Sequence, residues 1–164
     1  MRPASLTVIT KNMNQIILVL RKDVPVWVLP GGGIDASETP YHTARRETWE
    51  ETGVHVSNLV HTATYTASSC ITGTLFVFSA TPDSFEIPYQ AKEEISAFRF
   101  FSKDSLPENL FFLHRIILEE YFSERKKPFE RPLQEITWKT VLRLFLAHPW
   151  HSLRYLATRM LSLR

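Results

Sequence analysis

The segment that most constrains this chain is a glycine-rich turn that leads into a helix with marked ends. Residues 30–33, with the sequence PGGG, predict a break in regular structure. Thr39 suits the N-cap position, and Pro40 suits the first turn, where its missing N–H costs nothing. Gly53 supplies the left-handed residue that commonly ends a helix. The sequence therefore predicts a helix from Pro40 to about Thr52.

Three carboxylates share one face of this predicted helix. Glu47, Glu50 and Glu51 are spaced i, i+3 and i+4. Like charges at these spacings repel, at a cost of roughly 0.2–0.5 kcal/mol per pair. A divalent cation removes the repulsion, because Mg²⁺ prefers carboxylate oxygens. The alternative is a solvated acidic face that Arg45 and Arg46 neutralise.

The wider segment resembles the Nudix box of the MutT-like hydrolases, G-x5-E-x7-R-E-U-x-E-E-x-G-U, where U is aliphatic. The positions that match are Gly32, Glu38, Arg46, Glu47, Glu50, Glu51, Gly53 and Val54. One position departs from the pattern, because Thr48 stands where the family places an aliphatic residue. A threonine there can donate its hydroxyl to the carbonyl of Ala44, so we expect a loss of packing but no loss of a ligand.

The resemblance implies an α/β fold, the family's α/β/α sandwich around a mixed β-sheet. It implies Mg²⁺-dependent hydrolysis of a nucleoside diphosphate derivative, with Mn²⁺ as a substitute and water attacking phosphorus. It also implies roles for residues of the box. The metal ligands would be Glu47, Glu50 and Glu51, and the catalytic residues would be Glu50, Glu51, Glu94 and Arg46. Glu38 would be structural or bind metal weakly.

Glu94 enters this set through a second, weaker resemblance. Family members often take another glutamate, as base or ligand, from a loop beyond the box. Here Glu93 and Glu94 precede the residues ISAFRFF, a stretch similar to one in the family. We choose Glu94, and the alternative is that both are ordinary loop carboxylates.

Candidate substrate contacts lie in the glycine turn and on two strands. Gly31, Gly32 and Gly33 would let the backbone approach phosphates closely. Arg21 follows a buried strand and Arg99 lies within a later one, so each could meet phosphate. For Arg21 the alternative is simple exposure at the surface. For Arg99 the alternative is an ion pair with a box glutamate.

Hydropathy patterns place strands on both sides of the helix, in the order β-β-β-α-β-β-β-α, which favours a mixed sheet covered by helices. The expected strands are 6–10, 15–20, 26–29, 54–65 (irregular), 74–80 and 95–101, with a loop over 81–94 and a second helix over about 109–124.

The last forty or so residues differ in charge from the rest. Residues 124–164 contain nine Lys or Arg and three acidic residues, whereas residues 1–123 contain ten and fourteen. We expect a Nudix domain over 1–124 and a basic amphipathic helical extension over 125–164. Apolar residues recur at helical spacing there, and Pro149 predicts a break. The favoured interpretation is packing on the domain or across a homodimer. Alternatives are an anionic membrane surface and a 5′-capped RNA substrate, nucleic acid being otherwise disfavoured.

The remaining composition fits a cytoplasmic protein. The single cysteine, Cys70, excludes an intramolecular disulfide and is expected to be a spare thiol. The first apolar stretches are interrupted by polar residues, and no run is long enough for a transmembrane helix.

The substrate is left open by the sequence. A nucleoside triphosphate, an NDP-sugar or a dinucleoside polyphosphate all fit the box. The rival function is a non-catalytic Nudix-fold nucleotide-binding or regulatory module, whose signature, loss of box carboxylates, is absent here.

Overall fold

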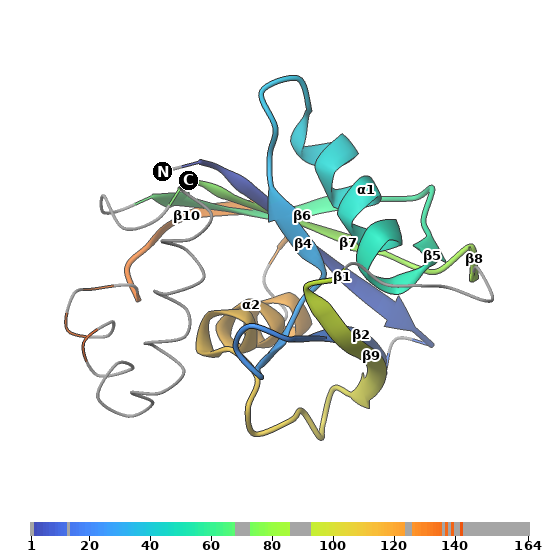
Figure 1. Cartoon of the computed structure of the whole chain (residues 1–164). Helices are drawn as coiled ribbons and strands as arrows, with labels where there is room; N and C mark the ends of the chain where they lie inside the picture. Colours follow the sequence, from blue (N-terminus) through green and yellow to red (C-terminus); the bar gives the residue numbers. More distant parts are fainter. Residues whose placement is uncertain are drawn as a thin grey trace.

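The computed structural model describes residues 2–12, 14–67, 73–85, 93–123 and 126–135, with Thr137, Lys139 and Leu142 (Figure 1). Its elements in chain order are β1 (Ala4–Lys11), β2 (Gln15–Arg21), β3 (Trp27–Val28), β4 (Gly31–Gly33), α1 (Pro40–Thr52), β5 (Val54–His55), β6 (Val60–Ala67), β7 (Leu75–Ala80), β8 (Ser84–Phe85), β9 (Ile95–Ser102), α2 (Phe112–Phe122) and β10 (Phe129–Leu133).

The main sheet is mixed, as expected. Its strands follow the order β10-β6-β7-β1-β2-β3, with β4 also paired to β1 and β9 to β2. The β1–β7 and β10–β6 pairs are parallel, and the other pairs of this sheet are antiparallel. A separate small sheet pairs β5 with β8. The strand β1 therefore lies between β7 and β2 in the sheet, and β4, which consists of the three glycines, also pairs with it.

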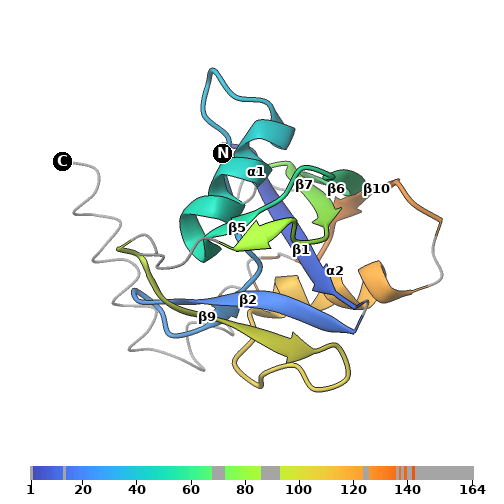
Figure 2. The same ribbon diagram turned by 90° about the vertical axis from the view of Figure 1, so that its right-hand side faces the viewer.

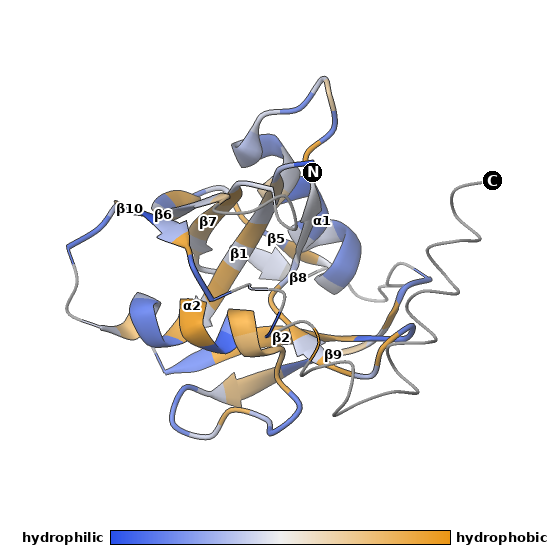
Figure 3. Ribbon diagram, turned by 90° about the vertical axis from the view of Figure 1, so that its left-hand side faces the viewer, coloured by the Kyte–Doolittle hydropathy of each residue, from blue (hydrophilic) through white to orange (hydrophobic). Residues whose placement is uncertain are grey.

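The two helices cover opposite faces of the sheet (Figures 1 and 2). Successive residues of a strand point to opposite faces, so β1 serves two cores. Leu6 and Val8 pack with Leu113 and Ile117 of α2, whereas Ile9 packs in the cluster that contains Ala44 of α1. The ribbon of β1 and parts of α2 are accordingly hydrophobic in Figure 3. The α/β/α sandwich is confirmed.

Both ends of α1 form as the sequence predicts. The hydroxyl of Thr39 accepts a hydrogen bond from the backbone N–H of His42 at 3.2 Å. Gly53 has φ = 67°, and its N–H donates to the carbonyl of Trp49 at 2.8 Å. These two caps fix the length of the helix that carries the carboxylates.

The hydrogen bond expected from the Thr48 hydroxyl to the carbonyl of Ala44 does not form. Its Oγ1 is fully buried and has no hydrogen-bond partner within the part of the chain that the structure describes. The carbonyl of Ala44 instead accepts from Oγ1 of Thr7, a residue of the neighbouring β1, at 3.4 Å. An unsatisfied buried hydroxyl is unfavourable, so Thr48 costs more than lost packing.

Thr48→Val is therefore expected to raise the free energy of unfolding by about 1 kcal/mol, because it removes an unsatisfied hydroxyl and keeps the side-chain shape. Urea denaturation measures the change. Thr52→Val is the matched control, since Oγ1 of Thr52 donates to the carbonyl of Thr48 and accepts from the N–H of Val54. The control should lower stability; a loss in both variants would contradict the interpretation.

Two further expectations about strands are corrected. Residues 31–33 were expected to break regular structure, but Gly31, Gly32 and Gly33 form β4 and pair with Leu6, Ser5 and Ala4 of β1. The irregular strand expected over 54–65 is two strands, and β5 pairs with β8 inside the expected loop 81–94. Both corrections have one cause: a pairing partner that lies far away in sequence overrides a weak local preference.

The second helix starts later than expected. The backbone N–H of Trp27 donates to the carbonyl of Asn109, and its carbonyl accepts from the N–H of Phe111, so residues 109–111 lie beside β3 and are not helical. The helix α2 consequently begins at Phe112.

The sheet also continues past the domain boundary expected at residue 124. The strand β10 pairs with β6, although it contains Pro132 and lies in the segment expected to be helical. Proline is tolerated there because β10 is at the edge of the sheet. Most of the expected tail helices, and Cys70, lie outside the described residues. No helix among the described residues is long and apolar enough to cross a membrane.

Candidate active site

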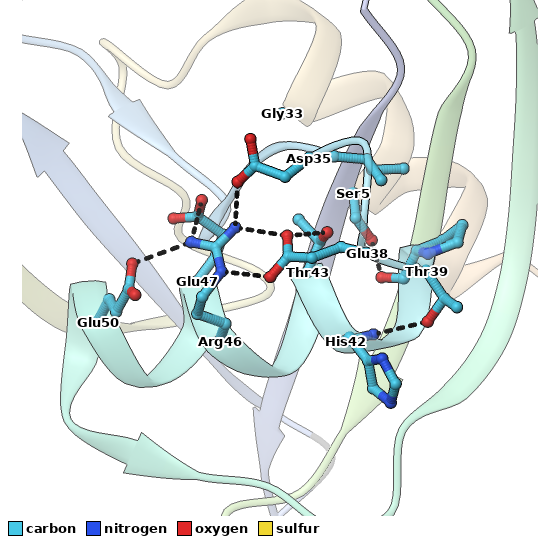
Figure 4. Close-up of polar contacts among 12 residues, drawn as sticks. Ser5, Gly33, Asp35, Glu38, Thr39, His42, Thr43, Arg46, Glu47 and Glu50 are labelled. Atoms are coloured by element: carbon cyan, nitrogen blue, oxygen red, sulfur yellow. Dashed lines mark hydrogen bonds and ion pairs between the residues drawn. The ribbon is translucent and has the colours of Figure 1, made fainter.

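Arg46 lies at the centre of the box carboxylates (Figure 4). Its Nε and Nη2 donate to the two oxygens of Glu38 at 2.7 and 2.8 Å. Its Nη1 donates to Glu47 at 2.9 Å and to Glu50 at 3.1 Å. One guanidinium thus joins the loop before α1 to two of the three carboxylates on the helix.

The electrostatics of this cluster identify Glu38 as the anchor of Arg46. Hydrogen bonds from Arg46, and then from the Thr43 hydroxyl, lower the pKa of Glu38 to about 2. The hydrogen bond to Glu38 is in turn the main cause that raises the pKa of Arg46. Both groups therefore stay ionised at neutral pH, which supports the expected structural role of Glu38.

The third carboxylate, Glu51, faces the glycine strand. The backbone N–H of Gly31 donates to its Oε2 at 3.0 Å. Gly31 has φ = 152°, and a Cβ there would come within 3.0 Å of the carbonyl oxygen of Ser5. Only glycine can take this position, which lets β4 approach both β1 and α1.

Glu47 lies against Gly32 in the same way. Glu47 is buried, with 6% of its surface exposed, and a Cβ on Gly32 would fall within 3.0 Å of its carboxylate. The absence of a side chain at Gly32 therefore makes the room that this carboxylate occupies.

Gly32→Ala is expected to lower activity about 10- to 100-fold, because the new methyl group displaces a carboxylate that Arg46 holds in place. Steady-state kinetics with a hydrolysed nucleotide measure the loss. Gly33→Ala is the matched comparison: the atoms nearest to its Cβ belong to the exposed side chain of Arg2, at 3.1 Å or more, and the backbone N–H proposed to meet phosphate is kept. Equal losses in the two variants would argue against a specific contact with Glu47.

Arg21 and Glu94 lie near one another at the end of β2. The backbone N–H of Lys22 donates to the carbonyl of Glu94 at 2.8 Å. Arg21 pairs with Asp23 at 2.8 and 2.6 Å, and this hydrogen bonding raises its pKa, with smaller contributions from Glu94 and Glu51. The Glu94 side chain is exposed. The fold thus gathers Arg21, Glu94 and Glu51 within electrostatic range.

Arg99 is not brought to the carboxylates. It alternates along β9 with Phe98 and Phe100, which pack on the α1 side, so it points with Ala97 and Phe101 to the α2 side. It forms no ion pair with any residue that the structure describes, so the expected pairing with a box glutamate is not found.

His114 holds the chain just before the glycine strand, and sequence reasoning missed it. It lies on α2, is 8% exposed, and its Nδ1 accepts from the backbone N–H of Leu29 at 2.8 Å. Burial, followed by the charge of Arg21, lowers its pKa to about 3. The ring is therefore neutral and fixes the residue that precedes the turn into β4. Its position within the apolar pattern of α2 made it look like an ordinary helix residue.

The donor chemistry fits a hard divalent cation. Glu47, Glu50 and Glu51 offer only carboxylate oxygens, and Arg46 already places positive charge between two of them. Within the described residues no three acidic, His or Cys side chains converge as a metal cage; Arg46 and Gly31 are the groups that bind the carboxylates there. These three carboxylates could therefore bind a divalent cation without a ligand from elsewhere in the chain.

Comparison with known proteins identifies the same segment. The NUDIX domain family matches residues 1–121. A putative 8-oxo-dGTP diphosphatase of Bacillus subtilis is 46% identical over 50 residues, which are 30% of this chain and 34% of that protein. An RNA pyrophosphohydrolase of Bartonella henselae is 39% identical over 55 residues, 32% of each chain. The matches span about a third of the length of these curated relatives.

The fold resembles solved structures over a longer stretch. An ADP-ribose pyrophosphatase from Streptococcus suis superposes with a TM-score of 0.64 at 24% identity, covering 79% of this chain and 98% of that one. At this identity the likeness establishes the fold alone.

Proposed function

The chain belongs to the NUDIX family, and we propose that it hydrolyses the diphosphate linkage of a nucleoside diphosphate derivative in the presence of a divalent metal. The observation that carries the proposal is the arrangement around Arg46. It presents two carboxylates of α1 in fixed positions, and Glu51 stands beside them against β4. A non-catalytic family member has no need to keep all three.

Enzymes of this family generally use a divalent metal. Glu47, Glu50 and Glu51 would hold Mg²⁺, for which Mn²⁺ could substitute. When bound, the cation would draw charge from the diphosphate and favour attack by water on phosphorus. The glycine backbone fixes Glu51 through Gly31, and Arg46 fixes the rotamers of Glu47 and Glu50.

Other residues would handle the substrate and the proton. An oxygen of the Glu94 carboxylate, exposed near Arg21, would accept the proton of the attacking water. The guanidinium of Arg21 would contact the phosphates. So would the backbone of Gly32 and Gly33, which has no side chain to keep a phosphate away. Arg99, on the other side of the sheet, is the weakest member of the expected set.

The substrate class is tested by a panel. Relatives are named for 8-oxo-dGTP, RNA and ADP-ribose, and these join nucleoside triphosphates, NDP-sugars and dinucleoside polyphosphates as candidates. Each would be incubated with the full chain and Mg²⁺ or Mn²⁺, in ¹⁸O-labelled water, and resolved by chromatography and mass spectrometry.

We expect metal-dependent cleavage of at least one member, with ¹⁸O in a phosphate of the product. No cleavage by a folded chain of any member, capped RNA included, would favour the nucleotide-binding module instead. Label in a sugar or nucleoside hydroxyl, with none in either phosphate, would contradict attack on phosphorus.

A further inference from the structure

A groove of about 350 Å³ lies along α1. Glu38 and Arg46 of the carboxylate cluster line it, but none of the three expected metal ligands does. Its opposite wall is the chain from Val54 to Val56, and Figure 2 shows β5 next to α1. The side chains that define its chemistry are Glu38, Arg45, Arg46, Trp49 and His55. The volume falls within the usual range for small-molecule sites, about 300–1,000 Å³.

The groove has a planar aromatic wall on an apolar base. Trp49 is 39% exposed, and its ring lies 6.3 Å from that of His55, with an interplanar angle of 37°. Val54 and Val56 are 0% and 2% exposed and close the base. A large, partly exposed aromatic side chain that lines a groove is one on which a nucleobase can stack.

The guanidinium of Arg45, beside this wall, is available to bind an anion. The side chain of Arg45 is exposed and makes no ion pair or hydrogen bond to any residue that the structure describes. Its neighbour Arg46 is fully engaged by Glu38, Glu47 and Glu50. Glu38 is neutralised by that pair, so it offers little repulsion to an anion at Arg45.

We propose that this groove is a second nucleotide site, adjacent to the carboxylate centre and sharing Glu38 and Arg46 with it. A base would stack on Trp49, and the phosphate of the same ligand would pair with the guanidinium of Arg45. The combination of one planar face and one uncommitted guanidinium selects a nucleoside monophosphate over inorganic phosphate or a nucleoside alone.

The test is titration of the full-length chain with AMP, adenosine and inorganic phosphate, each in EDTA so that no divalent metal contributes. Calorimetry gives affinities, and the indole N–H signal of Trp49 in NMR reports the location. We expect AMP to bind more tightly than either fragment. Trp49→Ala should weaken AMP about 5- to 100-fold, and Arg45→Gln should bring it down to the affinity of adenosine.

Three variants act as controls. Trp49→Phe keeps a ring and should retain most of the affinity, which guards against a fold defect in Trp49→Ala. Val60→Ala and Lys139→Gln change an exposed apolar and an exposed basic residue elsewhere, and should have no effect.

Arg21→Gln separates this site from the proposed reaction site, and it should leave AMP affinity unchanged. Binding that is lost in Arg21→Gln but retained in Trp49→Ala would overturn the proposal. So would equal affinities for AMP and phosphate, or no AMP binding at millimolar concentration.

Discussion

Glu51→Gln is expected to lower kcat about 10³-fold, equivalent to roughly 4 kcal/mol of transition-state stabilisation, without lowering the thermal stability. Glutamine keeps an oxygen that can accept the N–H of Gly31, so β4 stays in place. It removes one charge from a face with three carboxylates, which relieves repulsion. Glu51→Gln should therefore lower kcat while the melting temperature stays the same or rises.

The measurement combines kinetics on a panel substrate, Mn²⁺ binding by EPR and a thermal melt. Glu119→Gln is the matched control, because it changes an exposed carboxylate on the other helix, α2. A loss of activity with unchanged Mn²⁺ affinity would mean that Glu51 is not a ligand. Activity within a few fold of wild type would contradict the proposed site.

The helix that carries this site could be predicted because its signals are local. Thr39, Pro40 and Gly53 act within one turn of the backbone they cap, and no distant partner competes with them. The same holds for the spacing of the three glutamates, which follows from helix geometry alone.

The pairing of short strands could not be predicted in this way. The glycines of β4 have weak strand preference, and they pair because β1 passes beside them. The strands β5 and β8 are two residues each and stabilise one another across a long loop. Pro132 argues against a strand unless β10 is known to be an edge.

Within the candidate site, the sequence indicated which residues gather but not how they are held. Arg46 was expected among the catalytic residues, and in the structure it holds Glu47, Glu50 and Glu38 together. The side of the sheet that Arg99 faces could be read only once the packing of its neighbours Phe98 and Phe100 was known. Asp23, the partner of Arg21, gave no signal beyond its place in a turn.

His114 should make the stability of the chain depend on pH in the mildly acidic range. Its folded pKa, about 3, lies below the value of 6.5 expected when unfolded. Between these values the unfolded state binds a proton that the folded state does not. Acid therefore favours unfolding, and the contribution of His114 is intact above about pH 6.5 and is lost as the pH falls toward 3.

From pH 7 to pH 5 this linkage amounts to about 2 kcal/mol. Urea denaturation at both pH values, on wild type and His114→Gln, isolates it, because glutamine can accept the N–H of Leu29 through its amide oxygen but does not titrate. The variant should lose about 2 kcal/mol less than wild type over this interval. His55→Gln, which changes an exposed histidine, should behave as wild type. Equal pH dependence in wild type and His114→Gln would mean that His114 is not held neutral, and that the turn before β4 is fixed by other contacts.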